Sequence, residues 1–573
     1  MTRLRGRAAA PGVALAPAAL LRPTEVENDD GPSGSPDEER RRVEDALARA
    51  AEQLRELAAQ VSADVGGDQG DIFEAHAAFA EDPELRARAR ERIDDGASAT
   101  AAAAASFDGF RELLAASDSE YLAARAADLD DVRDRVLALL AGRSVDVDVP
   151  NERSVIVAHE LTPSQTASIP RRVIAAVVTE TGSPTSHAAI LARSLGIPAV
   201  VGVAGIIELL VDGTELAVDG DDGEVLIAPD EETRTAIRER ITEAGRRREQ
   251  LEELRDEPGH TADGHRVELA ANIGSETDLE LAAAAGAEGS GLVRTEFLYL
   301  DRTDAPDIAE QAAFVERALT AFPGHRVVVR TLDVGADKPL PFVAREPEPN
   351  PALGLRGIRL GLASPDLFRD QLRALLRART AAGDAAGRLA IMFPLLSVPS
   401  ELTEARRHLD EVAAEEGHHL DGLEVGVMIE TPAAALAADQ FAAGSDFLSI
   451  GTNDLLQYLF AADRLNAEVA EIADAASPIV LQLIGEVVRA AHAKGAWVGV
   501  CGEAASDPAL AVALVGLGVD ELSMNSAAIP EVKATLREST LAHCRAVASR
   551  AAEQADAAAA RAELKGACSD QEA

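Results

Sequence analysis

The second half of this chain alternates short apolar runs with helical segments, and this alternation restricts the fold more than any other feature. Helical segments such as "PDLFRDQLRALLRART" (365–380) lie between several of the runs. Eight strand–helix units are the number expected for a closed (β/α)₈ barrel. The eight candidate strands are 265–273, 289–297, 326–333, 389–396, 423–431, 446–454, 496–503 and 521–526.

Polar residues end most of these apolar runs. In a barrel of parallel strands, the C-terminal strand ends meet on one face, and that face carries the active site. The sequence therefore predicts an active site built from these strand ends. The residues are Asn272, Arg294, Glu296, Arg330, Asp333, Glu430, Asn453, Asp454, Cys501, Glu503 and Asn525.

The cationic residues near these strand ends indicate a small anionic ligand. Arg294, Arg330 and Arg356 offer guanidinium groups that bind phosphate or carboxylate through two parallel hydrogen bonds. Arg464 follows the 446–454 run closely enough to join them. Lys338 is one of only four lysines in the chain, so its position beside this group supports an anion site.

Two carboxylates at adjacent strand ends, Glu430 and Asp454, suit a hard divalent cation, most naturally Mg²⁺. The alternative is that both pair with neighbouring arginines. Cys501 ends another strand, so we expect its thiol to reach the mouth, where a thiol can donate a proton to carbon. An inert buried cysteine is the more common situation, but the position favours a function.

The window "TGSPTSHAAILARSLGIPAVVGVAG" (181–205) places His187 where a helix begins. Unpaired backbone amides and the positive end of the helix dipole could hold a phosphoryl group on the imidazole there. Ser186 offers a hydroxyl, and Arg193 lies two turns further on. The alternative is that His187 merely caps the helix; the anion and metal site elsewhere favours a phosphohistidine.

Changes in the hydrophobic pattern, between short β runs and helical segments, divide the chain into four parts. Residues 1–24 and 143–230 contain short β runs and turn pairs, and they predict one small α/β domain. Residues 25–142 form a helical insert with helical segments at 43–61, 71–93, 99–117 and 121–142. A charged linker helix occupies 231–258, and the barrel follows in 259–573.

The charge is strongly acidic: 98 acidic against 55 basic residues give a net charge of −43. Such a surface repels nucleic acid and anionic membranes, and it favours adaptation to high salt over the alternative of an acidic mesophilic protein. Three cysteines without a Cys-x-x-Cys pair indicate a reduced, cytoplasmic protein. We expect neither a signal peptide nor a membrane-spanning helix.

Several long motifs resemble one family in order along the chain. The resemblance is to enzyme I of the phosphoenolpyruvate:sugar phosphotransferase system, and it extends over essentially the whole sequence. The motifs are "APGVALAPA", "TGSPTSHAAILARSLGIPAVVGV", "GLVRTEFLYLDR", "VVVRTLDVGADKPLP", "NPALGLRGIRL", "GVMIETPAA", "SIGTNDLLQYLFAADRLN" and "VCGEAASDP".

The resemblance implies autophosphorylation of His187 by phosphoenolpyruvate and transfer to the histidine phosphocarrier protein. It implies that Arg294, Arg330, Asn453 and Arg464 bind phosphoenolpyruvate, with Lys338 and Arg356 in support. It also implies that Glu430 and Asp454 hold Mg²⁺, that Cys501 protonates the enolate carbon, and that Thr166 hydrogen-bonds the histidine ring.

The helical insert would dock the carrier, with His76 at the docking surface. The barrel would form a homodimer, and the phosphohistidine domain would swivel between two sites.

Two other functions compete with this interpretation. A phosphoenolpyruvate synthase or pyruvate phosphate dikinase shares the histidine and the barrel, but it needs a large nucleotide-binding domain before the histidine domain. Only about 140 residues precede that domain here, without a phosphate-binding glycine-rich loop. A non-catalytic phosphoenolpyruvate sensor would have lost His187, Glu430, Asp454 or Cys501, and all four are present.

Overall fold

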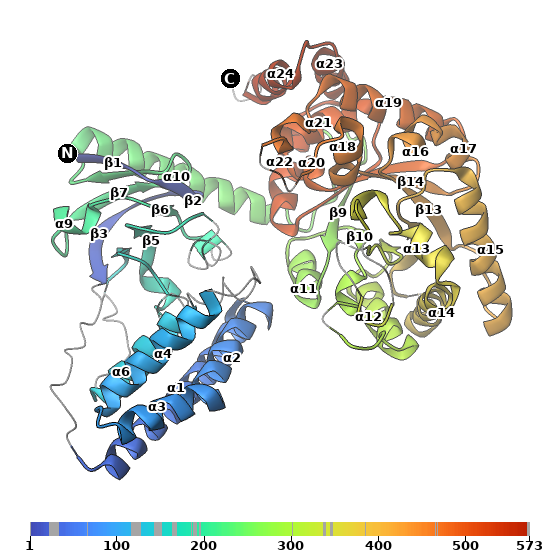
Figure 1. Cartoon of the computed structure of the whole chain (residues 1–573). Helices are drawn as coiled ribbons and strands as arrows, with labels where there is room; N and C mark the ends of the chain where they lie inside the picture. Colours follow the sequence, from blue (N-terminus) through green and yellow to red (C-terminus); the bar gives the residue numbers. More distant parts are fainter. Residues whose placement is uncertain are drawn as a thin grey trace. The chain divides into compact units, whose positions relative to one another are not determined.

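The computed structural model divides into two compact units, Met1–Arg248 and Glu249–Ala573 (Figure 1). Each unit is described by itself. The structure describes residues 2–21, 34–65, 67–115, 128–142, 152–162, 165, 169–184, 186, 189, 192–193, 196–300, 302–335, 340–343, 348–383, 385–464, 466 and 468–569.

The second unit contains a closed barrel of eight parallel strands, as the sequence predicted. The strands follow one another around the barrel in chain order, and the last pairs with the first. The strands are β9 (Glu268–Ile273), β10 (Gly289–Val293), β11 (Arg326–Arg330), β12 (Arg388–Phe393), β13 (Glu424–Ile429), β14 (Phe447–Gly451), β15 (Trp497–Cys501) and β16 (Glu521–Met524).

Helices follow the strands and supply the outer layer of the core. Every second residue of each strand packs against these helices in one large apolar cluster. Leu448 and Ile450 on β14 are examples. The helices are α11 (Glu276–Ala284), α12 (Ile308–Ala321), α13 (Ile358–Ala363), α14 (Pro365–Ala382), α15 (Pro399–Glu416), α16 (Pro432–Leu436), α17 (Ala438–Ala442), α18 (Thr452–Phe460), α19 (Pro478–His492), α20 (Glu503–Ser506), α21 (Pro508–Leu517), α22 (Ile529–Glu538), α23 (Leu541–Ala552) and α24 (Ala557–Ser569).

The barrel interior has an apolar middle layer and a charged floor. The middle layer includes Leu292, Val328 and Met428. At the N-terminal strand ends, which form the floor, the Arg326 guanidinium lies 2.7 Å from a carboxylate oxygen of both Glu268 and Glu424 and 3.4 Å from Glu521. The same guanidinium covers the ring of Trp497 at 3.9 Å, and that ring stacks on Phe447. The floor therefore closes the barrel opposite to the predicted active-site face.

The first unit contains an eight-stranded mixed sheet in the order β1-β8-β7-β3-β4-β5-β6-β2. The N-terminal strands pair with strands that come more than 100 residues later, and apolar clusters cover both faces. The elements are β1 (Thr2–Arg5), β2 (Arg7–Ala10), β3 (Val13–Leu21), β4 (Ser154–Ala158), β5 (Ile174–Thr179), β6 (Ala199–Val201), α9 (Ile206–Leu209), β7 (Glu215–Asp219) and β8 (Glu224–Ile227).

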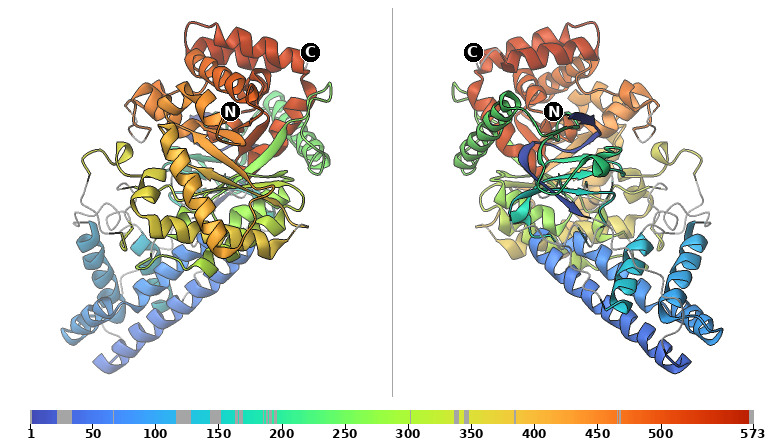
Figure 2. Two further views of the ribbon diagram at one scale, coloured as in Figure 1. Left: turned by 90° about the vertical axis from the view of Figure 1, so that its right-hand side faces the viewer. Right: turned by 90° about the vertical axis from the view of Figure 1, so that its left-hand side faces the viewer.

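A helical bundle is inserted in the chain between β3 and β4 (Figure 2). Its apolar faces form a core of their own. The expected helix over 71–93 is wrong in one respect, because Asp82 and Pro83 divide it in two. The Asp82 carboxylate accepts hydrogen bonds from the amides of Glu84 and Leu85, which starts a new helix. The helices are α1 (Pro36–Val65), α2 (Gly67–Glu81), α3 (Pro83–Asp94), α4 (Ala99–Ala115) and α6 (Asp128–Leu140).

The charged helix α10 (Glu231–Glu253) connects the two units along the chain. Its single fully buried residue among those described, Ile237, packs on Ala217 and Leu226 of the sheet. Beyond the helix, the Lys533 ammonium group donates a hydrogen bond of 2.7 Å to the carbonyl of Arg255. In the part of the chain that the structure describes, no helix is long and apolar enough to cross a membrane.

Candidate active site at the barrel mouth

A cavity of about 790 Å³ opens at the C-terminal ends of the barrel strands. Residues from the ends of every strand except β12 line it, because parallel strands deliver their last residues to one face. Thirteen residues that the sequence predicted for the site line this cavity. Eight of them were expected to bind an anion, a metal or a proton: Arg294, Arg330, Arg356, Glu430, Asn453, Asp454, Arg464 and Cys501. The other five are the strand-end residues Asn272, Glu296, Asp333, Glu503 and Asn525. Lys338 lies outside the described residues.

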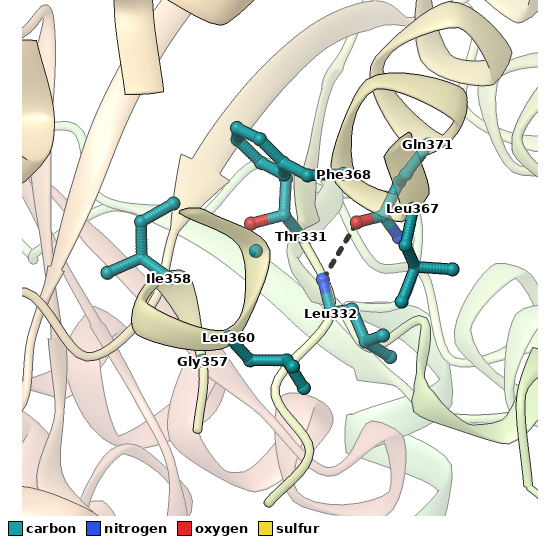
Figure 3. Close-up of a pocket in the computed structure, with 9 residues that line it drawn as sticks. Thr331, Leu332, Gly357, Ile358, Leu360, Leu367, Phe368 and Gln371 are labelled. Atoms are coloured by element: carbon teal, nitrogen blue, oxygen red, sulfur yellow. Dashed lines mark hydrogen bonds between the residues drawn. The ribbon is translucent and has the colours of Figure 1, made fainter. Parts of the chain in front are cut away.

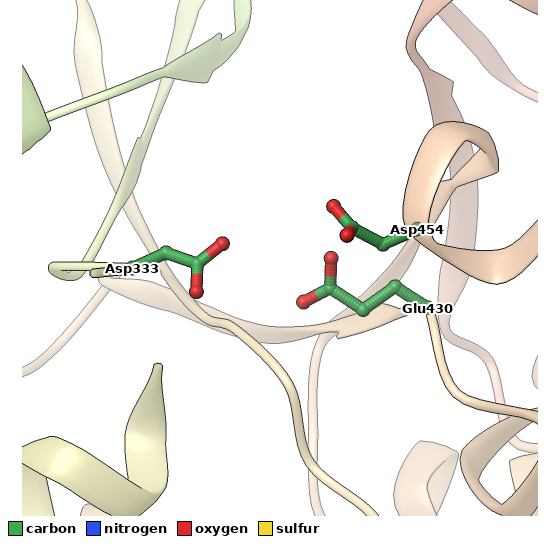
Figure 4. A group of neighbouring side chains, drawn as sticks. All are labelled: Asp333, Glu430 and Asp454. Atoms are coloured by element: carbon green, nitrogen blue, oxygen red, sulfur yellow. The ribbon is translucent and has the colours of Figure 1, made fainter. Parts of the chain in front are cut away.

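Three carboxylates from separate strand ends point toward one another in this cavity (Figure 4). Asp333, Glu430 and Asp454 are buried, and one oxygen of each lies within 4.8 Å of the others. The sequence analysis assigned Glu430 and Asp454 to a metal and left Asp333 as a strand-end residue only. Its place after the β11 strand was the available signal, but which carboxylate faces the other two depends on the packing of the following loop.

The environment of Glu430 fits a divalent cation. Its Oε1 accepts a hydrogen bond of 2.6 Å from the Leu395 amide, while Oε2 has no hydrogen-bond partner among the described residues. Burial, and then Asp333 and Asp454, raise the pKa of Glu430 to about 8. A buried carboxylate with a free oxygen, beside two other carboxylates, offers the oxygen donors that a hard cation prefers.

Local backbone geometry brings these groups together. Leu395 has a left-handed φ of 55°, which is costly for a residue with a branched side chain and directs its amide to Glu430. Gly357 has a φ of 59°, and a Cβ there would lie 2.8 Å from the Leu395 Cβ and 3.2 Å from Asp333 Oδ1. Glycine is therefore needed for the loop after β12 and the loop containing Arg356 to approach each other.

Arginines neutralise the carboxylates and stay charged. Arg330 lies 3.0 Å from both Glu296 and Asp333, and Arg356 lies 3.0 Å from Asp333 and 3.4 Å from Asp454. Burial alone lowers the pKa of Arg330, but Glu296 and Asp333 raise it above its ordinary value. The mouth thus presents buried, permanent positive charge to an anionic ligand.

A small void of about 10 Å³ lies between Thr331 and Leu332, which follow β11, and Phe368 and Gln371 of α14 (Figure 3). Gln371 of α14 borders it; its Oε1 accepts a hydrogen bond from the Leu332 amide, and its Nε2 donates one to Thr295 Oγ1. Thr295 in turn donates to the Arg330 carbonyl. The void is too small for a substrate. Gln371 fixes the backbone that directly follows the Arg330 side chain, through the Leu332 amide and, by way of Thr295, the Arg330 carbonyl.

Four further predicted mouth residues, Asn453, Arg464, Cys501 and Glu503, lie at or after the ends of the neighbouring strands β14 and β15. Arg464 is half-exposed, with its guanidinium 3.8 Å from Asp454. Asn453 accepts a hydrogen bond of 3.3 Å from the Glu503 amide. Gly502 between Cys501 and Glu503 has a φ of 120°, and a Cβ there would lie 2.6 Å from Thr452 Oγ1. This close contact places Cys501 beside residues 452–454, which form the first turn of α18.

Cys501 is buried at the inner end of the cavity. Burial raises the pKa of its thiol to about 11, although the hydrogen bond from Ser449 lowers it in part. The Cys501 thiol is therefore protonated at neutral pH, as a proton donor must be.

In the first unit, His187 and Thr166 lie outside the described residues. Ser186 is described, and its hydroxyl accepts a hydrogen bond of 3.4 Å from the Ala189 amide, as a helix-start residue does. Arg193 donates hydrogen bonds to the carbonyls of Ala9 and Pro184. Arg193 therefore ties the segment before His187 to strand β2.

His76 lies on α2 in the helical bundle and is buried, which differs from the exposed position expected for a docking residue. Its Nδ1 lies 3.6 Å from an Asp131 carboxylate oxygen on α6, and its ring meets Phe73 edge to face. In this structure the bundle core encloses the side chain.

Comparisons with known proteins identify the family of the chain. Three family profiles of PEP-utilising enzymes match the chain: the N-terminal domain over residues 5–125, the mobile domain over 150–223 and the PEP-binding domain over 248–541. The PEP-binding profile covers the barrel and its mouth.

Curated relatives match along nearly the whole chain. The phosphoenolpyruvate-protein phosphotransferase of Haloferax volcanii is 44% identical over 528 residues, covering 91% of each chain. The protein of the same name from Staphylococcus carnosus is 41% identical over 545 residues, covering 93% of this chain and 94% of its own. That of Streptomyces coelicolor is 45% identical over 507 residues, covering 87% and 88%. The chain belongs to the PEP-utilising enzymes, and within them to the phosphoenolpyruvate-protein phosphotransferase family.

Proposed function

We propose that this protein takes a phosphoryl group from phosphoenolpyruvate onto His187 and passes it to a histidine phosphocarrier protein, the first step of sugar uptake by a phosphotransferase system. The observation that carries the proposal is the barrel mouth, where buried arginines and three carboxylates line one cavity. Phosphoenolpyruvate carries a phosphate and a carboxylate, and guanidinium groups suit both.

Arg294, Arg330 and Arg464, with Asn453, would bind the substrate anion, and Arg356 and Lys338 would support them. Glu430 and Asp454, joined by Asp333, would hold Mg²⁺, which supplies positive charge where the enolate develops. On binding, the substrate's own negative charges would replace part of the pairing between the arginines and Asp333. Before the substrate arrives, these arginines are therefore paired with a carboxylate. The pairing avoids the cost of burying an isolated charge.

Two residues of the chain, His187 and Cys501, would carry out the chemical step. A neutral ring nitrogen of His187 attacks phosphorus; the N–P bond forms, the bond from phosphorus to the enol oxygen breaks, and the enolate of pyruvate leaves. Cys501 then gives its thiol proton to the methylene carbon, which yields pyruvate. Ser186, Arg193 and Thr166 would support the phosphohistidine.

The organisation proposed from the sequence accounts for the second transfer. A phosphohistidine domain of residues 1–24 and 143–230, a carrier-binding insert of 25–142 with His76 near the docking surface, a linker at 231–258 and the barrel at 259–573 would let His187 visit two sites. We also propose a cytoplasmic homodimer that assembles through the barrel.

The test is incubation of the full chain with phosphoenolpyruvate labelled in its phosphate, with Mg²⁺ and without ATP. Acid-labile label on the protein, absent from the His187→Ala variant, and its transfer to a purified phosphocarrier protein support the proposal. Label that arrives only from ATP would instead assign the chain to the dikinase or synthase reaction. Binding of phosphoenolpyruvate without label would indicate a sensor.

A further inference from the structure

Cys501 has a hydroxyl neighbour on β14, Ser449, that the proposed reaction has not yet used. Strands β14 and β15 pair in parallel, with Ser449 opposite Gly499 and Gly451 opposite Cys501. Their outward neighbours Leu448 and Val500 pack against the helices, so Ser449 and Cys501 both face the interior. The Ser449 hydroxyl donates a hydrogen bond of 3.4 Å to the Cys501 sulfur.

Apolar side chains adjoin this hydroxyl on the β13 side. Ser449 is 1% exposed, and it pairs with Met428 of β13, which forms an interior apolar cluster with Met392. A buried hydroxyl destabilises a protein unless it is hydrogen-bonded, and its partner among the described residues is the thiol. Alanine would fill nearly the same space, so packing does not explain a serine here.

The directions of the hydrogen bonds around the Cys501 sulfur indicate a role for the Ser449 hydroxyl in proton transfer. The Cys501 thiol donates toward the Ile450 carbonyl at 3.7 Å, while it accepts from Ser449. When the S–H bond breaks, the sulfur becomes an anion in a buried place, where negative charge is costly. The Ser449 O–H already points at the sulfur, and a hydrogen bond to a charged group is about twice as strong as one between neutral groups.

We propose that Ser449 is a positioning residue for proton transfer by Cys501: its hydroxyl orients the sulfur and stabilises the thiolate left when the proton moves to the methylene carbon of the enolate. The S–H bond breaks, a C–H bond forms with the enolate electron pair, and solvent in the cavity returns a proton to the sulfur. This inference rests on the proposed function, since it assigns the same proton to the same carbon.

The reverse proton transfer isolates this step from phosphoryl transfer. Unphosphorylated full-length protein is mixed with pyruvate and Mg²⁺ in D₂O, and NMR follows the replacement of methyl hydrogen by deuterium. The same preparations are tested for label from phosphoenolpyruvate in a single turnover. We expect Ser449→Ala to slow the exchange by about ten- to hundredfold, the effect of losing one hydrogen bond to a charged group. Its single-turnover label should stay within about twofold of wild type.

Three further variants make the result specific. Ser449→Thr keeps the hydroxyl and should restore exchange, which a purely structural role of the serine would not require. Cys501→Ala should abolish exchange. Ser290→Ala removes another buried barrel hydroxyl, which donates to the Ala271 carbonyl instead of to a thiol, and should exchange as wild type does.

The outcomes separate the two claims. Exchange at the wild-type rate in Ser449→Ala, or undiminished exchange in Cys501→Ala, overturns the inference while label from phosphoenolpyruvate still supports the proposed function. Wild-type protein that takes no label overturns the proposed function itself. Should Ser449→Ala lose its fold, Ser449→Gly repeats the removal of the hydroxyl in a smaller residue.

Discussion

At the scale of single residues, the barrel mouth depends on charges that are buried next to one another. Glu430 illustrates this, because one oxygen accepts a hydrogen bond from the Leu395 amide, the other has no hydrogen-bond partner among the described residues, and Asp333 and Asp454 lie beside the carboxylate. Burial makes each of these charges expensive to leave without a partner. The site therefore gains specificity for a cation and an anion that arrive together.

Replacing Glu430 with glutamine tests this arrangement. Glu430→Gln keeps the shape and an oxygen for the Leu395 amide, but it removes one of the carboxylates that suit a divalent cation. We expect weaker Mg²⁺ binding in calorimetry and a loss of label from phosphoenolpyruvate of about a hundredfold or more.

A matched control exists on the same strand. Glu424→Gln removes a carboxylate at the opposite end of β13, where the partner is Arg326 of the floor. Mg²⁺ binding should be unchanged in this variant. Equal loss in both variants would show that Glu430 acts through the fold rather than through the cation.

At the scale of elements, α14 holds the β11 strand end from outside the barrel. Gln371 hydrogen-bonds the Leu332 amide and Thr295, and Thr295 in turn donates to the Arg330 carbonyl. Gln371→Met fills similar space without hydrogen bonds and leaves the buried Leu332 amide without its acceptor, so we expect destabilisation by about 1–3 kcal/mol. The Michaelis constant for phosphoenolpyruvate should also rise, because Arg330 loses its fixed position.

Gln311 on α12 provides a matched control for the Gln371→Met variant. It is buried as Gln371 is, and it hydrogen-bonds Tyr299 and the Pro306 carbonyl. Gln311→Met should destabilise the protein without changing the Michaelis constant. A rise of equal size in both variants would argue that the effect on substrate follows from stability alone.

The barrel floor makes a separate prediction about pH. Burial, and then Glu268, raise the pKa of Glu521 to about 8, although Arg326 opposes this. The folded state therefore binds this proton more tightly than the unfolded chain. The stabilisation from the proton is complete below about pH 4.5 and is lost as the pH rises through about 8.

Relative to Glu521→Gln, the wild type should lose free energy of unfolding on the order of 2 kcal/mol between about pH 6 and pH 9. Denaturant unfolding followed by the fluorescence of Trp497, the only tryptophan in the chain and part of the floor, measures the difference. A parallel decline in the variant would assign the pH dependence to other groups.

The observed strands and helices also show where prediction from the sequence succeeded. Strands of the barrel are buried on both faces, so they read as continuous apolar runs that end in polar residues, and all eight were predicted close to their observed positions. The break between α2 and α3 was missed, because an amphipathic pattern continues through Asp82 and Pro83. The pair Asp82–Pro83 is a helix-start signal in the sequence itself, and the capping geometry shows that a new helix begins there.

At the scale of the whole molecule, a net charge of −43 dominates. Self-repulsion of this size opposes compact folding, and salt screens it. We therefore expect the melting temperature and the phosphoryl-transfer activity to rise between about 0.1 M and about 2 M KCl.

An uncharged osmolyte at matched osmolality serves as the control, since it does not screen charge. Full activity and an unchanged melting temperature in dilute buffer would rule out adaptation to high salt.

The sequence by itself determined the barrel, the helical insertion, the family and most of the mouth residues, because strand periodicity and long motifs are local properties of the chain. Tertiary structure decided which of those residues act together. Asp333 joins Glu430 and Asp454 only because the loops after β11 and β12 approach at Gly357. Ser449 and Cys501, 52 residues apart, meet only because parallel pairing aligns their strands. Such contacts depend on register and loop packing, which no local pattern encodes.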